Sequence, residues 1–231
     1  MNRSVTNIIR FGMDELLPRW VRDNKYFMYP FFYCAYRGKN ISQAMNFKKL
    51  VRTWSDEEYA DFYEKLNSIS RNRKTDLNSN CIEKLINTLS SESRSLADVG
   101  CGNGYLLETI KTHYSNLELT GVDIISPART ESFEFKSGHI EKLPLEDNSV
   151  DIICCTHVLE HCLKPDIAIK ELKRVARDKI IVVVPKQRPF FYTLDEHVNF
   201  YYHKEQLTAE IGLENYHCEN IKGDWFYEGF L

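Results

Sequence analysis

The sequence of 231 residues lacks several features that would assign it to a well-defined class of protein. No apolar run approaches the roughly 18 residues that a membrane-spanning helix needs. The first residues have neither the apolar stretch nor the small-residue cleavage site of a secretory signal. No internal repeat, low-complexity tract or Gly/Ser-rich linker is visible. These absences predict a globular, cytoplasmic protein.

Cysteine pairs in metal-binding or redox spacing are also absent. The seven cysteines include no Cys-x-x-Cys pair, and their number is odd. Cys154 and Cys155 lie within an apolar run. We therefore expect reduced cysteines in a core, not a disulfide framework or a zinc site. The seven are Cys34, Cys81, Cys101, Cys154, Cys155, Cys162 and Cys218.

The most informative segment present runs from Leu96 to Leu107. A short apolar strand leads into glycines at positions 100, 102 and 104, and an apolar helical pattern follows at once. Glycine lets the chain turn sharply and lets a ligand approach main-chain N–H groups. The start of the next helix offers unpaired N–H donors to an anionic group. An ordinary glycine-rich turn would look similar, so the downstream residues must decide.

A carboxylate follows at the spacing that a nucleoside-binding unit requires. Residues 117–123 alternate like a strand and end in Asp123, 23 positions after Gly100. An acid at about this distance accepts hydrogen bonds from ribose hydroxyls. The glycine spacing is Gly-x-Gly-x-Gly, which argues against NAD and FAD and favours a smaller ligand with a carboxylate.

These segments resemble the class I S-adenosylmethionine-dependent methyltransferases over about residues 95–211. Residues 98–104 look like that family's first motif, and Gly121-Val122-Asp123 looks like its ribose-binding acid. Residues 138–151 are similar to its adenine-side loop and fourth strand, although His139 stands where the family often has an acid. The resemblance implies S-adenosylmethionine as cofactor. It implies binding by Asp98, Gly100, Cys101, Gly102, Gly104, Asp123, Ile124, His139, Ile140, Glu141 and Thr156.

Three residues are candidates for catalysis. His157 directly follows an apolar strand, where the crevice at the carboxyl ends of strands opens. His197 and Glu196 follow the next strand, in a place that lines the acceptor pocket in the resembling family. Each could deprotonate a hydroxyl, and histidine suits this role near neutral pH. Each could equally be structural, and an anionic acceptor would need no base.

His157-Val158-Leu159-Glu160-His161 also matches the His-x-x-Glu-His pattern of a zinc protease class. That reading needs both histidines on one face of a long helix and a third ligand. Here the pattern begins at the end of a strand, so we expect no metal.

The N-terminal segment is basic and aromatic. Residues 1–52 contain ten Lys/Arg and three Asp/Glu, a net charge of +7, and eight aromatic residues lie between Trp20 and Tyr36. We expect a helical extension over residues 1–94 and the cofactor-binding domain over 95–231. The extension could be a structural cap, a lid, or a peripheral contact with a membrane or lipid-linked substrate. Binding of nucleic acid is disfavoured because residues 95–231 carry fourteen basic and twenty-two acidic residues.

The predicted fold class is α/β, a doubly wound, mixed, seven-stranded sheet of the Rossmann-like methyltransferase type. Helices are expected within 55–94, at 166–177 and at 203–211, and an edge hairpin at 216–231 with its turn at Gly223-Asp224. Pro127 predicts that the connection after Asp123 holds no full helix.

The expected function is transfer of a methyl group, to oxygen on a small-molecule or glycan-type acceptor. Two alternatives stay open: a catalytically inactive binding subunit, or a methyltransferase acting on nucleic acid or protein. The chain lacks Asn-Pro-Pro-Tyr, Asp-Pro-Pro-Tyr and Pro-Cys sequences, which lowers the expectation of nucleic-acid methylation. The oligomeric state is not readable from the sequence.

Overall fold

The computed structural model describes residues 12–55, 58, 62, 74–90, 92–127 and 131–231. Most of the helix predicted after Ser55 lies outside these residues. Its start is described: the Ser55 N–H donates to Glu58 Oε2 (2.8 Å), and the Glu58 N–H donates to Ser55 Oγ (3.2 Å). This reciprocal pair is a capping box, which marks a helix N-terminus.

The chain divides into two compact units. The first takes in residues up to 73 together with 187–200, and the second takes in 74–186 and 201–231. The boundary predicted at residue 94 differs from this division. Helix α6 (Ser79–Thr88) belongs to the second unit because Cys81 and Leu85 are fully buried in its core. Residues 187–200 were expected within the cofactor-binding domain but belong to the first unit.

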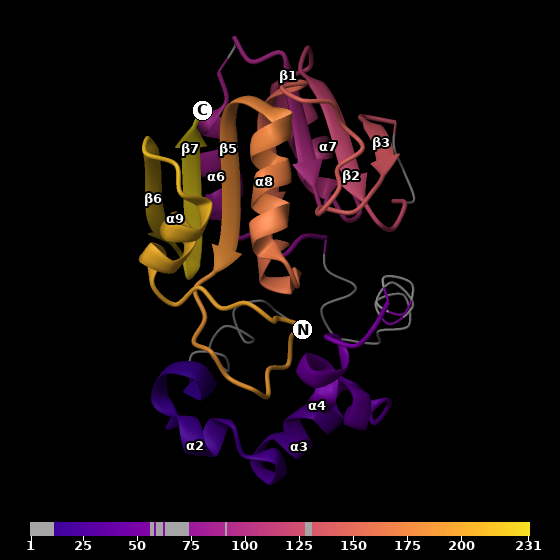
Figure 1. Ribbon diagram of the computed structural model, residues 1–231, viewed down its shortest axis with the longest axis vertical. Helices are drawn as coiled ribbons and strands as arrows, with labels where there is room; N and C mark the ends of the chain where they lie inside the picture. The colour runs from indigo at the N-terminus through magenta and orange to yellow at the C-terminus, as the bar shows by residue number, and fades with distance from the viewer. Residues whose placement is uncertain (1–11, 56–57, 59–61, 63–73, 91, 128–130) are drawn as a thin grey trace. The chain divides into compact units, whose positions relative to one another are not determined.

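A mixed sheet of seven strands, in the order β3-β2-β1-β4-β5-β7-β6, forms the second unit (Figure 1). The first five strands run parallel, and β7 pairs antiparallel with both β5 and β6. The predicted fold class is confirmed. The strands are β1 (Ser95–Val99), β2 (Glu118–Asp123), β3 (Glu134–Ser137), β4 (Val150–Thr156), β5 (Ala176–Pro185), β6 (Tyr216–Ile221) and β7 (Asp224–Phe230).

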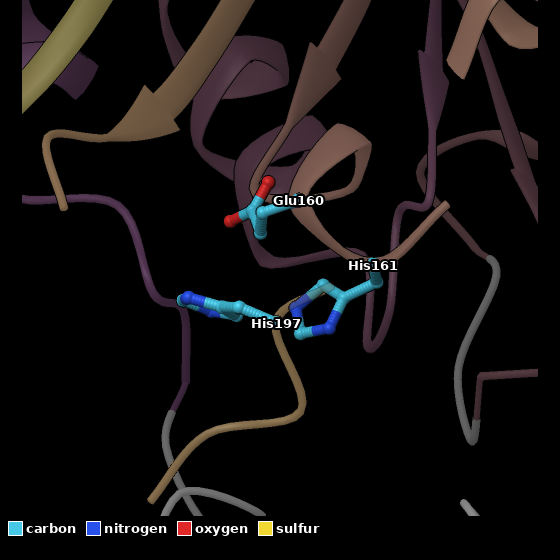
Figure 2. Close-up of side chains that lie close together, drawn as sticks. All are labelled: Glu160, His161 and His197. Atoms are coloured by element: carbon cyan, nitrogen blue, oxygen red, sulfur yellow. The ribbon is translucent and has the colours of Figure 1, made fainter. Parts of the chain in front are cut away.

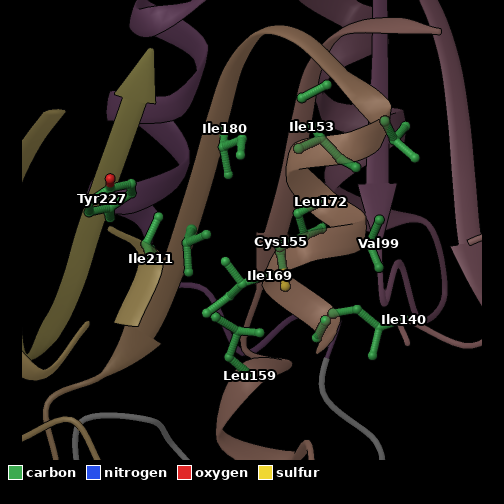
Figure 3. Close-up of a cluster of buried hydrophobic side chains, with 14 of the residues drawn as sticks. Val99, Ile140, Ile153, Cys155, Leu159, Ile169, Leu172, Ile180, Ile211 and Tyr227 are labelled. Carbon is green, nitrogen blue, oxygen red and sulfur yellow. The ribbon is translucent and has the colours of Figure 1, made fainter. Parts of the chain in front are cut away.

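Helices cover both faces of this sheet. Helices α6 and α7 (Tyr105–His113) pack on one face, and α8 (Pro165–Val175) and α9 (Lys204–Ile211) pack on the other. Strand β4 shows why: Ile152 and Cys154 enter one core, while Ile153 and Cys155 enter the other. Figure 3 shows Ile153 and Cys155 among the residues beneath α8. A strand buried on both faces reads as a continuous apolar run, which explains the sequence of β4.

The connections around the sheet follow local residue chemistry. Between β2 and β3 the described residues contain no helix, as Pro127 predicts. The hairpin of β6 and β7 turns at Lys222 and Gly223, whose φ angles are 54° and 94°. Two positive φ values match a type I′ turn and the twist of a hairpin. The turn therefore lies one residue earlier than predicted, and Asp224 is the first residue of β7.

The first unit has its own small core. Helices α3 (Lys25–Ala35) and α4 (Ile41–Leu50) contribute Met28, Phe32 and Phe47 to it. A π-helical turn (Gly12–Leu16) and the short helix α2 (Arg19–Arg22) precede them. No described helix is long and apolar enough to cross a membrane.

A buried arginine joins residues 187–200 to these helices. The Arg22 guanidinium donates to Asp14 Oδ1 (3.1 Å) and to the carbonyl oxygen of Tyr192. The Phe191 N–H donates to Asp23 Oδ1 (2.5 Å). Because a buried guanidinium must be paired, these bonds explain why the segment after β5 belongs to the first unit.

Candidate functional site

The sheet reverses its strand order at β1, which lies between β2 and β4. The chain winds from β1 to β2 and β3 on one side and then crosses to β4 and β5 on the other, so a crevice opens at the carboxyl ends of the strands. Asp98, Asp123 and Thr156 all lie at these ends. The candidate cofactor site is therefore built from residues of the second unit.

The glycine loop joins β1 to α7 in a left-handed conformation. Gly100, Gly102 and Gly104 have φ angles of 76°, 54° and 80°. The Gly100 and Cys101 N–H groups both donate to the carbonyl oxygen of Val122 (2.7 and 3.2 Å), which ties the loop to β2. Residues with a Cβ rarely adopt such φ values, so glycine is required by conformation at each position.

The three glycines differ in what surrounds them. A Cβ at Gly100 would lie 2.2 Å from Val158 Cγ2, and one at Gly104 would lie 2.5 Å from the Phe133 ring. Gly100 and Gly104 therefore allow the loop to pack closely against side chains of the same unit. At Gly102 a Cβ would meet nothing within 4 Å. The main chain there faces open space, which is the condition for close approach of a ligand.

Asp123 is anchored and still able to bind. Its Oδ2 accepts from the Gly102 N–H (2.8 Å), and its Oδ1 accepts from the Ile125 N–H (3.0 Å). An ionised carboxylate has about four lone-pair sites, so two remain. The fixed carboxylate lies beside the open face of Gly102, where it can accept from ribose hydroxyls.

Asp98 presents a buried carboxylate with an unused oxygen. The residue is 2% exposed, and its Oδ1 has no hydrogen-bond partner in the part of the chain that the structure describes. Burial, together with the nearby charge of Asp123, raises the pKa of Asp98 to about 8. A buried acceptor without a partner costs stability, and a cationic ligand would satisfy it.

These observations fit S-adenosylmethionine. Its ribose matches the remaining acceptor sites of Asp123, its amino-acid portion matches the open main chain at Gly102, and its positive charge matches Asp98. The helix that starts at Tyr105 adds N–H donors toward a carboxylate.

The residues expected on the adenine side, His139, Ile140 and Glu141, lie close to Asp123 but differ in their contacts and burial. Asp123 pairs with Ser137 across β2 and β3, which brings the turn at 138–142 alongside. His139 accepts from the Glu141 N–H at Nδ1 (3.3 Å), while Ile140 is buried in the core. Cys101 is likewise buried, and burial raises the pKa of its thiol. Ile140 and Cys101 could therefore meet a ligand through their main chains more readily than through their side chains.

Thr156 ends β4, and His157 follows it with a left-handed backbone (φ 56°). Two carboxylates flank the imidazole: Glu160 Oε1 lies 3.1 Å from Nδ1, and Asp224 Oδ2 lies 3.5 Å from Nε2. Burial alone would lower the pKa of His157, but the two carboxylates outweigh it and raise the pKa to about 10. The ring is therefore a cation near neutral pH, which does not suit a general base.

Asp224 also connects His157 to helix α6. Asn78, the N-cap of α6, accepts from the Cys81 N–H and donates to Asp224 Oδ2 (2.7 Å) and to the carbonyl oxygen of Ile221 (2.9 Å). Sequence reasoning missed both Asn78 and Asp224. No local pattern pointed to them, because the sheet topology alone brings them to the end of β4.

The zinc-protease reading does not agree with the fold. Only Leu159–His161 form a short 3₁₀ helix, and His157 precedes it with a positive φ. The two histidines therefore do not share the face of a long α-helix. Figure 2 shows Glu160 and His161 on this short turn; His197, also labelled there, belongs to the first unit.

His197 and Glu196 lie in the segment 187–200. His197 Nδ1 lies 2.5 Å from Gln187 Oε1, and Gln187 Nε2 donates to Asp195 Oδ2 (3.3 Å). Glu196 Oε1 accepts from the Tyr36 hydroxyl (2.8 Å). Both side chains are thus held by partners within their own unit.

The state of His157 can be measured directly. Imidazole NMR of the whole protein should show His157 protonated up to a pH of about 10, and Asp224→Asn should lower this pKa because one of two carboxylate charges is lost. Because the folded pKa is raised, its stabilising contribution is complete below the unfolded pKa of about 6.5 and declines as the pH rises toward 10. A His157 pKa near the ordinary value in the parent protein would refute its pairing with the two carboxylates.

The open face of Gly102 gives a second prediction. Gly102→Ala should weaken S-adenosylmethionine binding in calorimetry by at least about tenfold, or ~1.4 kcal/mol, because the methyl group enters the ligand's space. Gly212→Ala is the matched control: Gly212 also has a positive φ (65°), but it ends α9. Both variants should lose similar folding stability, and only the first should lose affinity. Equal affinity in the two variants would show that no ligand approaches Gly102.

Comparisons with known proteins identify the domain that carries these residues. Residues 97–184 match the family described as a methyltransferase domain. The ubiquinone biosynthesis O-methyltransferase of Hydrogenovibrio crunogenus is 26% identical over 177 residues, covering 72% of this chain and 66% of that protein. An uncharacterized methyltransferase of Schizosaccharomyces pombe is 29% identical over 99 residues, 36% of each chain. This chain thus spans at most about two thirds of the length of these two relatives.

A solved structure supports the fold. The structure of a SAM-dependent methyltransferase from Aquifex aeolicus has a TM-score of 0.51 and 18% identity, and the match covers 74% of this chain and 97% of that one. The family match spans β1 to the end of β5, the part that carries the glycine loop, Asp123 and His157. Residues 97–184 therefore form a methyltransferase domain of the class I, S-adenosylmethionine-dependent type.

Proposed function

We propose that this methyltransferase methylates an oxygen atom of a small-molecule or glycan-type acceptor, with His197 as the general base. The hydrogen bond between His197 and Gln187 carries the proposal. A hydroxyl is a weak nucleophile and needs a base, whereas a carboxylate or phosphate does not. The name of the Hydrogenovibrio relative, an O-methyltransferase, points the same way.

Gln187 determines which nitrogen of His197 can act. Gln187 Nε2 donates to Asp195, so its Oε1 faces His197 Nδ1 and can only accept. A neutral His197 ring must then carry its proton on Nδ1 and its lone pair on Nε2. A base oriented by a second polar group is the arrangement that activates hydroxyl nucleophiles.

The place of this segment in the chain also supports the role. Residues 187–200 lie between Lys186 and Tyr201. Lys186 and Tyr201 form a parallel bridge next to the carboxyl end of β5. The two residues that flank the segment, Lys186 and Tyr201, are thus fixed beside the carboxyl end of β5.

The other two candidates receive different roles. His157 is a cation held by two carboxylates, so we assign it the positioning of the turn after β4. Glu196 accepts from Tyr36, and burial and the Glu196 charge raise the pKa of that hydroxyl. Tyr36 therefore stays protonated and continues to donate. Glu196 holds residues 187–200 to α3.

When bound, S-adenosylmethionine supplies an electrophilic methyl group on a positive sulfur. Asp98 provides negative charge near that cation, and Asp123 and the glycine loop determine where the ligand lies. His197 Nε2 takes the proton of the acceptor hydroxyl. Orientation of reactants can contribute roughly 7–11 kcal/mol, so positioning is the main task of the remaining residues.

His197→Ala should lower methyl transfer to a hydroxyl acceptor by roughly 10²–10⁴-fold, while S-adenosylmethionine affinity in calorimetry stays unchanged. Acceptors can be found by screening the purified protein with labelled cofactor against glycans, lipid-linked sugars and phenols. Gln187→Ala should reduce the rate less, because it removes the orienting bond and leaves the base. His217→Ala is the control, since His217 is exposed on β6.

Three results decide the assignment. Full activity of His197→Ala over the whole pH range would exclude a base at this position. No transfer to any acceptor by the parent, with cofactor binding intact, would favour the inactive binding subunit. Transfer to protein or nucleic acid, and not to these small acceptors, would replace the proposed acceptor class.

A further inference from the structure

Helix α3 of the first unit is apolar on its outer face as well as on its inner face. Its inner face places Met28 and Phe32 in the core of that unit. Its outer face carries Tyr26, Tyr29 and Tyr33, which are 86%, 48% and 55% exposed. After Lys25 the helix has no charged residue. A helix of a water-soluble domain ordinarily has a polar outer face, so α3 has an unexplained second surface.

The exposed rings continue onto the preceding turns. Trp20 in α2 is 77% exposed, and Leu16 is 70% exposed. Among the described residues twelve large hydrophobic side chains are exposed, and six of them lie within the short stretch from Leu16 to Tyr33. Scattered exposed apolar residues are ordinary, but a concentration of this kind marks an interaction surface. We call it the aromatic surface: Leu16, Trp20, Tyr26, Phe27, Tyr29 and Tyr33.

The residue types point to a particular partner. Four of the six are Trp or Tyr, whose rings have an apolar body and a polar edge. Such rings are enriched where hydrocarbon meets water at a membrane surface.

The charge around the aromatic surface is mainly positive. No Asp or Glu occurs between Asp23 and Asp56, whereas this interval contains six Lys or Arg residues. Lys25 is exposed at the start of α3, and Arg37 and Lys39 are exposed just after its end. Of the three acids before α3, Asp14 is buried against Arg22, Asp23 pairs with the exposed Arg19 (3.3 Å), and Glu15 is exposed. Anionic lipid headgroups complement this charge.

We propose that the aromatic surface docks the protein on anionic membranes, with its rings at the headgroup level and Lys25, Arg37 and Lys39 against the phosphates. The contact is peripheral, as for an amphipathic interfacial helix. It rests on the first unit alone and does not depend on the identity of the methyl acceptor.

Co-sedimentation of the full chain with vesicles tests the proposal. Vesicles of phosphatidylcholine and phosphatidylserine in equal parts should pellet the protein at low salt, and vesicles of phosphatidylcholine alone should pellet much less. Lys25→Gln with Lys39→Gln should weaken binding roughly 25-fold, because each basic residue near the surface contributes about fivefold. Raising the salt concentration should weaken parent binding, since exposed charges are screened.

A second variant separates the rings from the charges. Trp20→Ser with Tyr26→Ser should also reduce binding, by more than about tenfold. Leu163→Ser with Lys170→Gln is the matched control, because both residues are exposed in the second unit. Trp20 fluorescence should shift to shorter wavelength with anionic vesicles, and this shift should be absent in Trp20→Ser. Circular dichroism should show all variants folded.

Two outcomes would overturn the proposal. One is the absence of pelleting and of any fluorescence shift with anionic vesicles at low salt. The other is a concentration-dependent dimer in analytical ultracentrifugation that Trp20→Ser with Tyr26→Ser converts to monomer while vesicle binding stays unchanged. That result would assign the aromatic surface to a second copy of the chain.

Discussion

The geometry of the candidate cofactor site in the second unit depends on one close contact between two loops. The loop after β1 and the turn after β4 meet where Val158 Cγ2 lies 2.2 Å from the position that a Cβ of Gly100 would occupy. Only glycine permits this contact, and His157, the residue before Val158, has a positive φ. The ion pairs of His157 with Glu160 and Asp224 hold that backbone in place. The ion pairs of His157 therefore also stabilise the contact between Val158 and the glycine loop.

Acidic side chains gather near the carboxyl ends of the strands in the second unit. Asp98, Asp123, Glu160 and Asp224 are all acids at or near the carboxyl ends of the strands. Two of them share the positive charge of His157, while Asp98 has an oxygen without a partner among the described residues. A positively charged ligand is the natural counterpart of that arrangement. Residues 1–52 of the first unit carry a net charge of +7 instead.

Local patterns predicted much of this architecture. An apolar run located β4, the glycine spacing located the loop after β1, and the spacing from Gly100 identified Asp123 as the acid at the end of the next strand. Three features could not be read in this way. Asp224 is distant from His157 in sequence, helix α6 packs in the core of the second unit, and residues 187–200 join the first unit through Arg22. Each arises from contacts that the sheet or the small core creates, and neither periodicity nor spacing encodes them.

The central claim is that Asp98, Asp123 and the open face of Gly102 together hold S-adenosylmethionine, and proton-linked calorimetry tests it most directly. In the free protein Asp98 is protonated below its pKa of about 8, and a cationic ligand should lower that pKa. Binding below this pH should therefore release up to one more proton in the parent than in Asp98→Asn, measured as the dependence of the binding enthalpy on the buffer. The difference should vanish well above pH 8. Identical proton release in the parent and in Asp98→Asn at every pH would contradict the account.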